Sequence, residues 1–265
     1  MGHFTNKVIV ITGASSGIGK ALALQMADKN VQLILAARRL DELKLLQEEC
    51  EKKGAACTSL FIDLASPDTI SAFAETVMAR FQKVDVLVNN AGVSQRSHAE
   101  EAPLELVRQI MEVNFFGQVH LTKSLWPLIV KSEHANIVLI SSVVGSFGYP
   151  LRSSYSASKH ALEGFFESWL IENKRPNIFF TTAVPGRINT HISYSALKAD
   201  GSRHAQMDDG QAKGITAEAC AKKIIKAITN NKRKVYIAKQ EMVLIFLRKF
   251  FPPLFFNLAK KLRST

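Results

Sequence analysis

Short apolar runs alternate with segments of helical periodicity along this chain, and this alternation constrains the fold more than any other feature. Chains with this pattern build βαβ units, in which successive strands lie parallel in one buried sheet. The runs are almost uninterrupted Val, Ile, Leu and Phe, which is typical of strands covered by helices on both faces. The predicted strands are residues 8–11, 32–36, 58–62, 84–88, 137–140, 178–183 and 235–238. We therefore predict an α/β fold in three layers, a doubly wound, seven-stranded parallel sheet flanked by about six helices.

A single domain accounts for most of the 265 residues, because an α/β chain with 47% hydrophobic composition can bury one large core at this length. We assign residues 1–241 to this domain. A polar insertion at residues 191–214 interrupts the pattern, and its three glycines favour a mobile substrate lid, with an unstructured surface loop as the alternative. Residues 242–265 form a basic and aromatic extension.

The net charge of +11 lies entirely in the last part of the chain. From residue 222 onward there are 12 basic residues and one acid, Glu241, whereas the first 221 residues hold 22 of each sign. A nucleic-acid-binding protein would carry its basic face on the body of the domain. This distribution therefore argues against a nucleic-acid partner.

The C-terminal extension is too short in its apolar part to cross a bilayer, because residues 242–247 are six apolar residues where a spanning helix needs about 20. Phenylalanines and basic residues follow this run. Such a composition fits either a peripheral contact with anionic lipid or a cover over the pocket or a partner subunit. Both alternatives remain open. The residues concerned are Phe250, Phe251, Phe255, Phe256, Lys260, Lys261 and Arg263.

The three cysteines, Cys50, Cys57 and Cys220, are too few and too scattered for a disulfide framework. No Cys/His cluster has the spacing of metal ligands, so we expect no bound metal. The N-terminal residues show no basic and then apolar leader. These features together predict a cytoplasmic, reducing location.

A glycine-rich turn follows the first predicted strand. Residues 12–19 read Thr-Gly-Ala-Ser-Ser-Gly-Ile-Gly, and a helical run at residues 20–28 comes next. Gly13, Gly17 and Gly19 allow a tight turn in which backbone N–H groups approach a pyrophosphate at a helix N-terminus. The order of strand, glycines and helix predicts a Rossmann-type dinucleotide site at the carboxyl end of the sheet.

The end of the second predicted strand indicates which dinucleotide is bound. An acidic residue at this place would bind a ribose 2′-hydroxyl, but the chain has Ala37 followed by Arg38 and Arg39. Guanidinium groups form charge-assisted, bidentate bonds with phosphate. The sequence therefore favours NADP(H) over NAD(H), with Arg38 as the main contact. Asp41 is interpreted as a helix-start residue.

A tyrosine and a lysine four residues apart begin the helical segment at residues 153–174. Tyr155 and Lys159 therefore share one helix face. The strand before them ends in Ser141 and Ser142, which places a hydroxyl at the carboxyl edge of the sheet. A free phenol has a pKa near 10, so we expect the Lys159 ammonium to lower the Tyr155 pKa for acid/base work near neutral pH.

Together these motifs resemble the short-chain dehydrogenase/reductase family over essentially the whole chain. The resemblance rests on the turn at residues 12–19, Asp63, the Asn-Asn-Ala-Gly run at residues 89–92, Asn114, Ser142, Tyr155, Lys159 and the run from Pro185 to Thr190. The string Gly148-Tyr149-Pro150 is similar to the hydroxysteroid-dehydrogenase-like branch. The family carries out hydride transfer between a nicotinamide cofactor and a carbonyl or alcohol.

This resemblance implies a role for each matching residue. Tyr155 would exchange the proton with the substrate oxygen, and Lys159 would hold the nicotinamide ribose and lower the Tyr155 pKa. Ser142 would polarise the substrate oxygen. Asn114, within the helical run at residues 104–130, would anchor a water that relays protons to Lys159. The residues implied to bind cofactor are Gly13, Ser15, Ser16, Gly17, Ile18, Gly19, Arg38, Arg39, Asp63, Leu64, Asn90, Ala91, Gly92, Tyr155, Lys159, Pro185, Gly186, Ile188 and Thr190.

The substrate is expected to be lipophilic, because apolar side chains surround the predicted chemistry. Its contacts would be Ser142, Val144, Tyr149 and Tyr155, with Val93, Ser94, Val143 and Phe147 nearby. Many family members with NADP preference carry a basic residue where this chain has Ser16, so the preference depends on Arg38 and the missing acid. We also expect a homodimer or homotetramer. The alternative function is a catalytically silent dinucleotide-binding sensor or scaffold.

Overall fold

The computed structural model describes residues 4–28 and 30–261 and contains the predicted sheet. Seven parallel strands lie in the order β3-β2-β1-β4-β5-β6-β9. The fold class is confirmed, and each predicted strand overlaps an observed one. The strands are β1 (Val8–Thr12), β2 (Gln32–Ala37), β3 (Ala56–Phe61), β4 (Val86–Asn89), β5 (Ala135–Ile140), β6 (Ile178–Pro185) and β9 (Lys234–Ile237).

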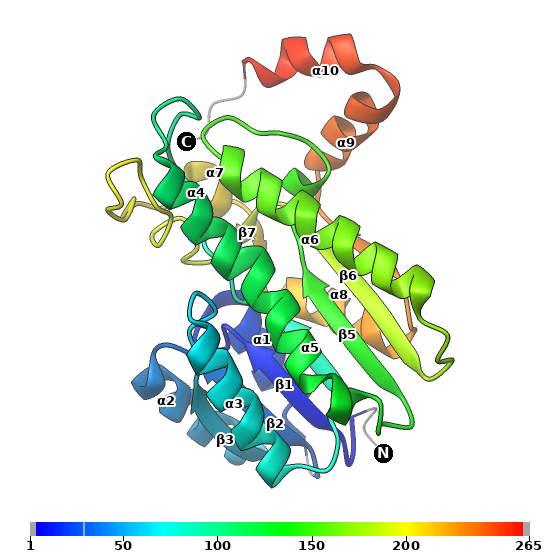
Figure 1. Ribbon diagram of the computed structural model, residues 1–265. Helices are drawn as coiled ribbons and strands as arrows, with labels where there is room; N and C mark the ends of the chain where they lie inside the picture. Colours follow the sequence, from blue (N-terminus) through cyan, green and yellow to red (C-terminus); the bar gives the residue numbers. More distant parts are fainter. Residues whose placement is uncertain (1–3, 29, 262–265) are drawn as a thin grey trace.

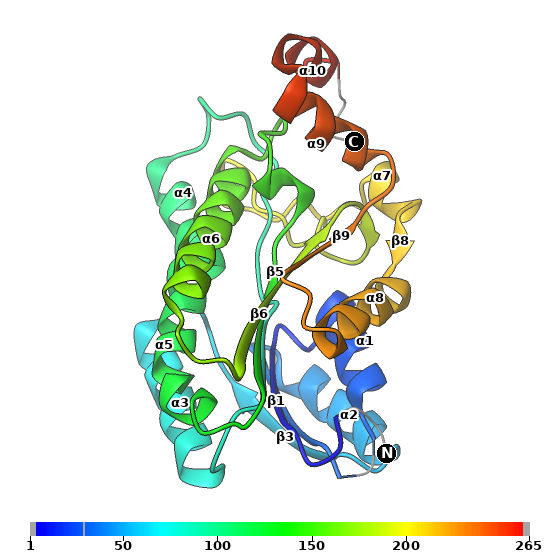
Figure 2. The same cartoon turned by 90° about the vertical axis from the view of Figure 1, so that its right-hand side faces the viewer.

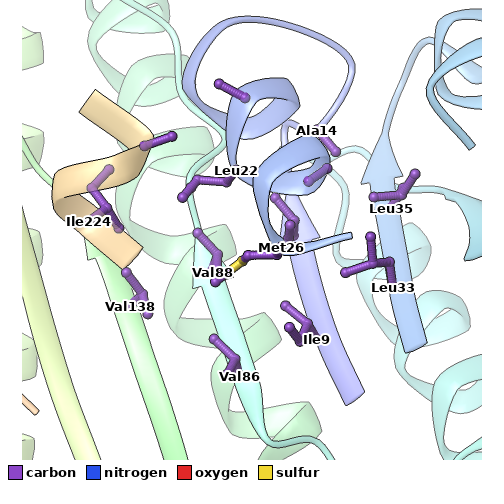
Figure 3. Packing of buried hydrophobic residues seen from close by; sticks show 14 of the residues in the cluster. Ile9, Ala14, Leu22, Met26, Leu33, Leu35, Val86, Val88, Val138 and Ile224 are labelled. Carbon is purple, nitrogen blue, oxygen red and sulfur yellow. The ribbon is translucent and has the colours of Figure 1, made fainter. Parts of the chain in front are cut away.

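Helices cover both faces of this sheet, as Figure 2 shows with the sheet nearly edge-on. One face carries α1 (Gly17–Met26), α2 (Leu40–Glu51) and α8 (Ala217–Thr229), and the other carries α3 (Pro67–Arg80), α4 (Leu104–Met111), α5 (Gly117–Ile129) and α6 (Ser153–Glu172). Each face has its own buried apolar cluster. In Figure 3, Leu22 and Met26 of α1 point toward Ile9 and Val88 on the strands. Burial of both faces explains why the strands are apolar throughout.

The chain changes direction across the sheet at β1, which pairs with β2 on one side and β4 on the other. The connections on the two sides of such a switch point diverge, and this leaves a crevice beyond the carboxyl ends of the strands. The glycine-rich turn follows β1 at this place. The strand order therefore positions the site.

The helix predicted at residues 104–130 is interrupted. α4 ends at Met111, a π-helical turn covers Glu112–Phe116, and α5 begins at Gly117. A π turn inserts an extra residue into the helical hydrogen-bond ladder and is frequent at functional sites. A Cβ on Gly117 would lie 2.2 Å from the Leu64 carbonyl oxygen, so the helix begins again where it passes very close to the chain after β3.

The insertion at residues 191–214 is bounded by a small second sheet that was not predicted. β7 (Ile188–Asn189) pairs in parallel with β8 (Ile215–Thr216), and the short helix α7 (Asp209–Ala212) lies between them in sequence. Backbone bridges join Leu197 to both Gln95 and Arg203. These pairings give the insertion defined contacts with the loop after β4.

Two helices, α9 (Glu241–Phe250) and α10 (Pro252–Ala259), project from the carboxyl edge of the sheet in Figure 1. Their inner side packs on the domain, since Leu247 and Phe255 are buried and the rings of Phe255 and Phe147 lie 5.6 Å apart between centroids. Their outer side exposes Phe246, Phe250, Phe251, Leu254 and Phe256. Within the described residues, no helix is long and apolar enough to cross a membrane.

Candidate active site

A cavity of about 1250 Å³ lies at the carboxyl edge of the sheet. Its lining runs from the glycine-rich turn, past the ends of β2, β4, β5 and β6, to the insertion at residues 191–214 and α9. All the residues that the sequence implied for cofactor contact line it except Gly19, which lies beneath the turn. The implied substrate contacts, Ser142, Val144, Tyr149 and Tyr155, also line it, whereas Asn114 lies behind the wall.

The glycine-rich turn is held against the end of β4 by polar contacts. Asn90 Nδ2 donates to the Thr12 carbonyl oxygen at 2.8 Å and to the Gly13 carbonyl oxygen at 3.2 Å. The Thr12 hydroxyl accepts from the backbone N–H groups of Asn90 and Ala91. A Cβ on Gly19 would lie 2.4 Å from the Gly13 carbonyl oxygen. Only glycine fits there, which keeps the turn tight enough for a phosphate to meet backbone N–H groups.

The two arginines after β2 have different surroundings. Arg39 Nη2 donates to the hydroxyls of Ser15 and Ser16, each at 3.0 Å, and its Nη1 contacts Glu42. Arg38 lies 3.9 Å from the Asp63 carboxylate and is more than half exposed. We expected Arg38 to be the main phosphate contact, yet Arg39 is the guanidinium that bridges to the glycine-rich turn. The hydroxyls of Ser15 and Ser16 therefore hold the Arg39 guanidinium beside the glycine-rich turn. The spacing of residues in the sequence did not indicate this contact.

Tyr155, Ser142 and Lys159 come together where β5 ends and α6 begins. Tyr155 is buried and hydrogen-bonded to Ser142, which caps a 3₁₀ turn at Val143–Gly145. Lys159 Nζ donates to the Ile140 carbonyl oxygen at 2.8 Å and lies 5.8 Å from the centre of the Tyr155 ring. The phenol, the serine hydroxyl and the ammonium thus line one wall of the cavity.

Burial is the largest influence on the pKa values of Tyr155 and Lys159. It raises the pKa of the Tyr155 phenol, against the lowering by the Ser142 hydrogen bond and by the charges of Arg152 and Arg96. It also lowers the pKa of Lys159 to about 8, while the Glu163 carboxylate acts in the opposite direction. In this arrangement the charges that lower the Tyr155 pKa are those of Arg152 and Arg96, and a lowering by Lys159 beside an oxidised nicotinamide stays a prediction. The cost of placing a phenolate in a buried site outweighs the nearby cations.

Asn114 occupies the π-helical turn and is fully buried. Its Oδ1 accepts from the Val93 N–H at 2.8 Å, and its Nδ2 donates to the Val93 carbonyl oxygen at 2.9 Å and to the Ser158 hydroxyl at 3.0 Å. A Cβ on Gly92 would lie 3.1 Å from Asn114 Oδ1 and 3.7 Å from Lys159 Nζ. The asparagine therefore joins the loop after β4 to α6 beside the lysine.

Ser141 and Asn89, which come just before Ser142 and Asn90, have structural contacts. Ser141 donates to the Glu163 carboxylate, which also contacts Lys234. Asn89 Nδ2 donates to the Thr122 hydroxyl at 2.9 Å in the buried interior. These contacts tie Ser141 to α6 and Asn89 to α5, so both side chains serve the packing around the site.

Sequence reasoning missed a charged cluster beside Tyr155. Asp208 in the insertion forms ion pairs with Arg96 and with Arg152, the latter at 3.0 Å. His204 Nε2 lies 3.6 Å from the same carboxylate. Burial lowers the pKa of Arg152 to about 10. Asp208 stands 112 residues from Arg96 and 56 from Arg152 in sequence, so no local pattern could have linked them.

The insertion at residues 191–214 and the C-terminal helices meet at Arg187. Its backbone N–H donates to the Glu241 carboxylate at 3.0 Å, and its Nη2 lies 3.5 Å from the Tyr149 hydroxyl. A Cβ on Gly210 of the insertion would lie 2.8 Å from Arg187 Nε. Of the two interpretations of the extension, a cover over the pocket agrees with Leu244, Leu247 and Leu258 lining the cavity. The described residues contain no group of side chains arranged to hold a metal ion.

Known proteins resemble this chain in sequence and in structure. The family model described as short chain dehydrogenase matches residues 7–200. Dehydrogenase/reductase SDR family member 7B of Mus musculus is 36% identical over 261 residues, covering 97% of this chain and 81% of its own length. Dehydrogenase/reductase SDR family member 7 of Homo sapiens is 32% identical over 256 residues, covering 94% of this chain and 76% of its own.

Among solved structures, a short chain dehydrogenase/reductase from Burkholderia phymatum in complex with NAD superposes with a TM-score of 0.85 at 25% identity, covering 96% of each chain. A metagenomic short-chain oxidoreductase in complex with NADP superposes with a TM-score of 0.74 at 25% identity, covering 89% of this chain and 98% of its own. Both similarities extend over the sheet that carries the cavity.

Proposed function

The chain belongs to the short-chain dehydrogenase/reductase family and is an oxidoreductase that uses a nicotinamide dinucleotide, and from this premise we propose that it transfers hydride between NADP(H) and the carbonyl or secondary alcohol of a lipophilic substrate. The observation that carries the proposal is the buried Tyr155 phenol, hydrogen-bonded to Ser142 and close to Lys159 in one cavity. We propose Asn114, Ser142, Tyr155 and Lys159 as the residues of the chemistry.

In the proposed mechanism Ser142 and Tyr155 hold the substrate oxygen between their hydroxyls. A bound nicotinamide supplies or accepts the hydride. Tyr155 Oη gives its proton to the oxygen during reduction and takes it back during oxidation. Because phenolate is disfavoured in this buried place, the protonated phenol is a ready proton donor. Lys159, with a pKa of about 8, can exchange a proton near neutral pH, and Asn114 positions the backbone and α6 around it.

Proton transfer by Tyr155 can be tested with Tyr155→Phe. We expect turnover to fall by at least about 100-fold, the usual contribution of a positioned acid, while NADPH binding is unchanged because the ring still packs. Tyr236→Phe, on β9 and outside the cavity lining, is the matched control and should keep full turnover. Retained turnover in Tyr155→Phe would contradict the mechanism. A protein that binds NADPH but reduces no carbonyl compound would be the silent sensor or scaffold instead.

The proposed preference for NADP(H) is supported by the two guanidinium groups that line the cavity after β2, where Ala37 replaces an acidic residue. A 2′-phosphate there would receive charge-assisted bonds from Arg38 and Arg39. One structural relative was solved with NAD and another with NADP, so the residues of this chain carry the argument. Fluorescence titration should give a lower Kd for NADPH than for NADH. Equal Kd values would reject the preference.

The lipophilic substrate is supported by the apolar wall beyond Ser142, which includes Val143, Val144, Phe147, Leu244 and Leu247. Several of these side chains also belong to one buried cluster that contains Tyr155. A panel of ketones, aldehydes and alcohols of increasing chain length, followed by NADPH absorbance, should show kcat/KM rising with chain length. No increase with chain length would reject a lipophilic substrate.

The proposed membrane contact and cellular location are supported by exposed side chains and by the cysteines. The outer side of α9 and α10 combines exposed aromatic side chains with Arg248, Lys249, Lys260 and Lys261, which suits peripheral contact with an anionic membrane. Cys50, Cys57 and Cys220 are free thiols, in keeping with a reducing, cytoplasmic location.

We also propose a homodimer or homotetramer, which light scattering on the purified protein would test.

A further inference from the structure

One buried guanidinium beside Tyr155 is only partly paired. Arg152 Nη2 donates to Asp208 Oδ2 at 3.0 Å, but Arg152 Nη1 is buried and has no hydrogen-bond partner among the described residues. The Arg152 side chain is 14% exposed. A buried charged group that lacks a partner costs folding free energy, so a group that binds Arg152 Nη1, such as a ligand or an ordered water, would stabilise this site.

The nearby carboxylate cannot complete this pairing, because it is already fully engaged. Asp208 accepts from Arg96 Nη2 and Nε and from Arg152 Nη2, and His204 Nε2 lies 3.6 Å away. Arg96, in contrast, has a partner at each of its three side-chain nitrogens, since its Nη1 also donates to the Ser94 hydroxyl and to the Gln95 carbonyl oxygen. Arg96 and Arg152 thus share one carboxylate, and the three side chains together keep one positive charge in excess.

The substrate half of the cavity carries an excess of positive charge. Besides Lys159, its wall holds four arginines, at positions 96, 152, 187 and 203, and two carboxylates, Asp208 and Glu241. Glu241 is 3.9 Å from Arg187 and Asp208 is paired with Arg96. Arg203, which is exposed in the lid, forms no ion pair within the described part of the chain. Two of the four guanidinium charges are therefore uncompensated.

The uncompensated charge lies near the reacting group and next to the apolar wall. Arg152 is the residue just before α6, Tyr155 lies in the first turn of that helix, and both line the cavity. The Arg152 guanidinium also lies over the Tyr149 ring, 5.4 Å from its centre. A ligand reaching Tyr155 along Val143, Val144 and Phe147 would end beside this cation.

We propose that the substrate is an amphiphilic carbonyl compound with an acidic group, a carboxylate or a phosphate, a few bonds from the reacting carbon, and that Arg152 binds this group with Arg203 closing over it from the lid. This inference rests on the proposed oxidoreductase function and narrows its substrate class. An ordered water on Arg152 Nη1 is the competing occupant.

The first test compares two substrates that differ only in charge, 4-oxodecanoate and its methyl ester. Charge-assisted hydrogen bonds to a buried guanidinium should raise kcat/KM for the acid by at least about tenfold over the ester. Arg152→Gln should bring this ratio close to one, with a smaller reduction in Arg203→Gln. Arg80→Gln, an exposed arginine on α3, is the matched control and should keep the full ratio. Equal kcat/KM values for acid and ester in the unmodified enzyme would overturn the proposal.

A second test measures binding and does not depend on turnover or on the folding of a variant. Calorimetry on the enzyme saturated with NADP⁺, which occupies the cofactor's own phosphate contacts, compares octanoate, octyl phosphate and octanol. At least about tenfold tighter binding of either anion supports the proposal, and the tighter of the two distinguishes carboxylate from phosphate. Octanol binding as tightly as both anions overturns it and favours the ordered water. Absence of turnover with every carbonyl compound would reject the oxidoreductase proposal separately, since the anion preference is still measured.

Discussion

Asn114 donates a hydrogen bond through Nδ2 to the Ser158 hydroxyl at 3.0 Å, and this contact joins the π-helical turn to α6 one residue before Lys159. Ser158 in turn donates to the Tyr155 carbonyl oxygen at 2.8 Å. The turn, the start of α6 and the loop after β4 are therefore held by one buried polar network. Such a network rigidifies its surroundings only when all its members are paired.

We expect Asn114→Leu to lower the free energy of unfolding by roughly 2–4 kcal/mol, because it leaves the Val93 N–H and the Val93 carbonyl without their side-chain partners and removes the donor to the Ser158 hydroxyl. Ser158→Ala removes one of these contacts and should cost about 1 kcal/mol. Urea unfolding of both variants, with kcat alongside, measures the difference. Equal losses in the two variants would contradict a central role for Asn114.

Lys159→Met should abolish turnover and yet raise the free energy of unfolding at pH 7. Burial lowers the pKa of Lys159 from its ordinary value of 10.5 to about 8, so the folded protein pays to keep this ammonium charged below pH 8. Methionine removes that cost and loses the hydrogen bond to Ile140, for a net gain of roughly 1–3 kcal/mol.

The sign of the pH dependence follows from proton binding. Between about pH 8 and 10.5 the unfolded chain binds more protons at Lys159 than the folded chain, so the unmodified protein gains stability as pH rises through this range. The advantage of Lys159→Met should therefore be largest below pH 8 and shrink by pH 10. Urea unfolding from pH 6 to 10 checks this, and an advantage that grows with pH would show the shift to be wrong in direction.

Ala37→Asp should move the cofactor preference toward NADH. A carboxylate at the end of β2 would accept from a ribose 2′-hydroxyl and repel a 2′-phosphate, while engaging Arg38. We expect the ratio of the NADPH and NADH Kd values to change by at least about tenfold, since a charge-assisted contact is replaced by a like-charge one. Asp41→Asn, in the first turn of α2, is the control and should leave the ratio unchanged.

Gly19→Ala should weaken NADPH binding, whereas Gly164→Ala should stabilise the folded protein, although both glycines lie in helices. A Cβ on Gly19 would lie 2.4 Å from the Gly13 carbonyl oxygen and 2.6 Å from Asn90 Nδ2, so the turn must open and NADPH affinity should fall by at least about tenfold. A Cβ on Gly164 meets no described atom within 4 Å. Alanine there should add roughly 0.5–1 kcal/mol of stability. Thermal unfolding and NADPH titration separate the two effects.

Membrane contact by α9 and α10 is best tested without truncation, because Leu247 and Phe255 pack on the domain and their loss would expose the cavity. The triple variant Phe250→Ser, Phe251→Ser and Phe256→Ser changes only exposed rings. It should lose co-flotation with vesicles of phosphatidylserine and phosphatidylcholine but keep turnover of short ketones. Leu45→Ser, exposed on α2, is the control. Unmodified protein that does not float would reject the proposal.

Local patterns in the sequence determined the parallel sheet, its strands and the candidate site residues. The apolar run of a strand and the four-residue spacing of Tyr155 and Lys159 are local features of the sequence. Helical or extended backbone geometry alone decides which of these side chains share a face. The turn that contains Gly13, Gly17 and Gly19 was likewise predicted from the local sequence alone. The interruption of the helix at Asn114 was not predicted, because residues 104–130 have helical periodicity throughout, and the close passage of Gly117 past Leu64 is a tertiary contact.

Only the tertiary structure decided which charges meet. Asp208 reaches Arg96 and Arg152 across 112 and 56 residues, and Arg39 rather than Arg38 reaches the serines of the glycine-rich turn. The direction of the Tyr155 pKa shift likewise required its burial to be known. Ionisation and ion pairing depend on distances through space and on exclusion of water, and neither is encoded in the spacing of residues along the chain.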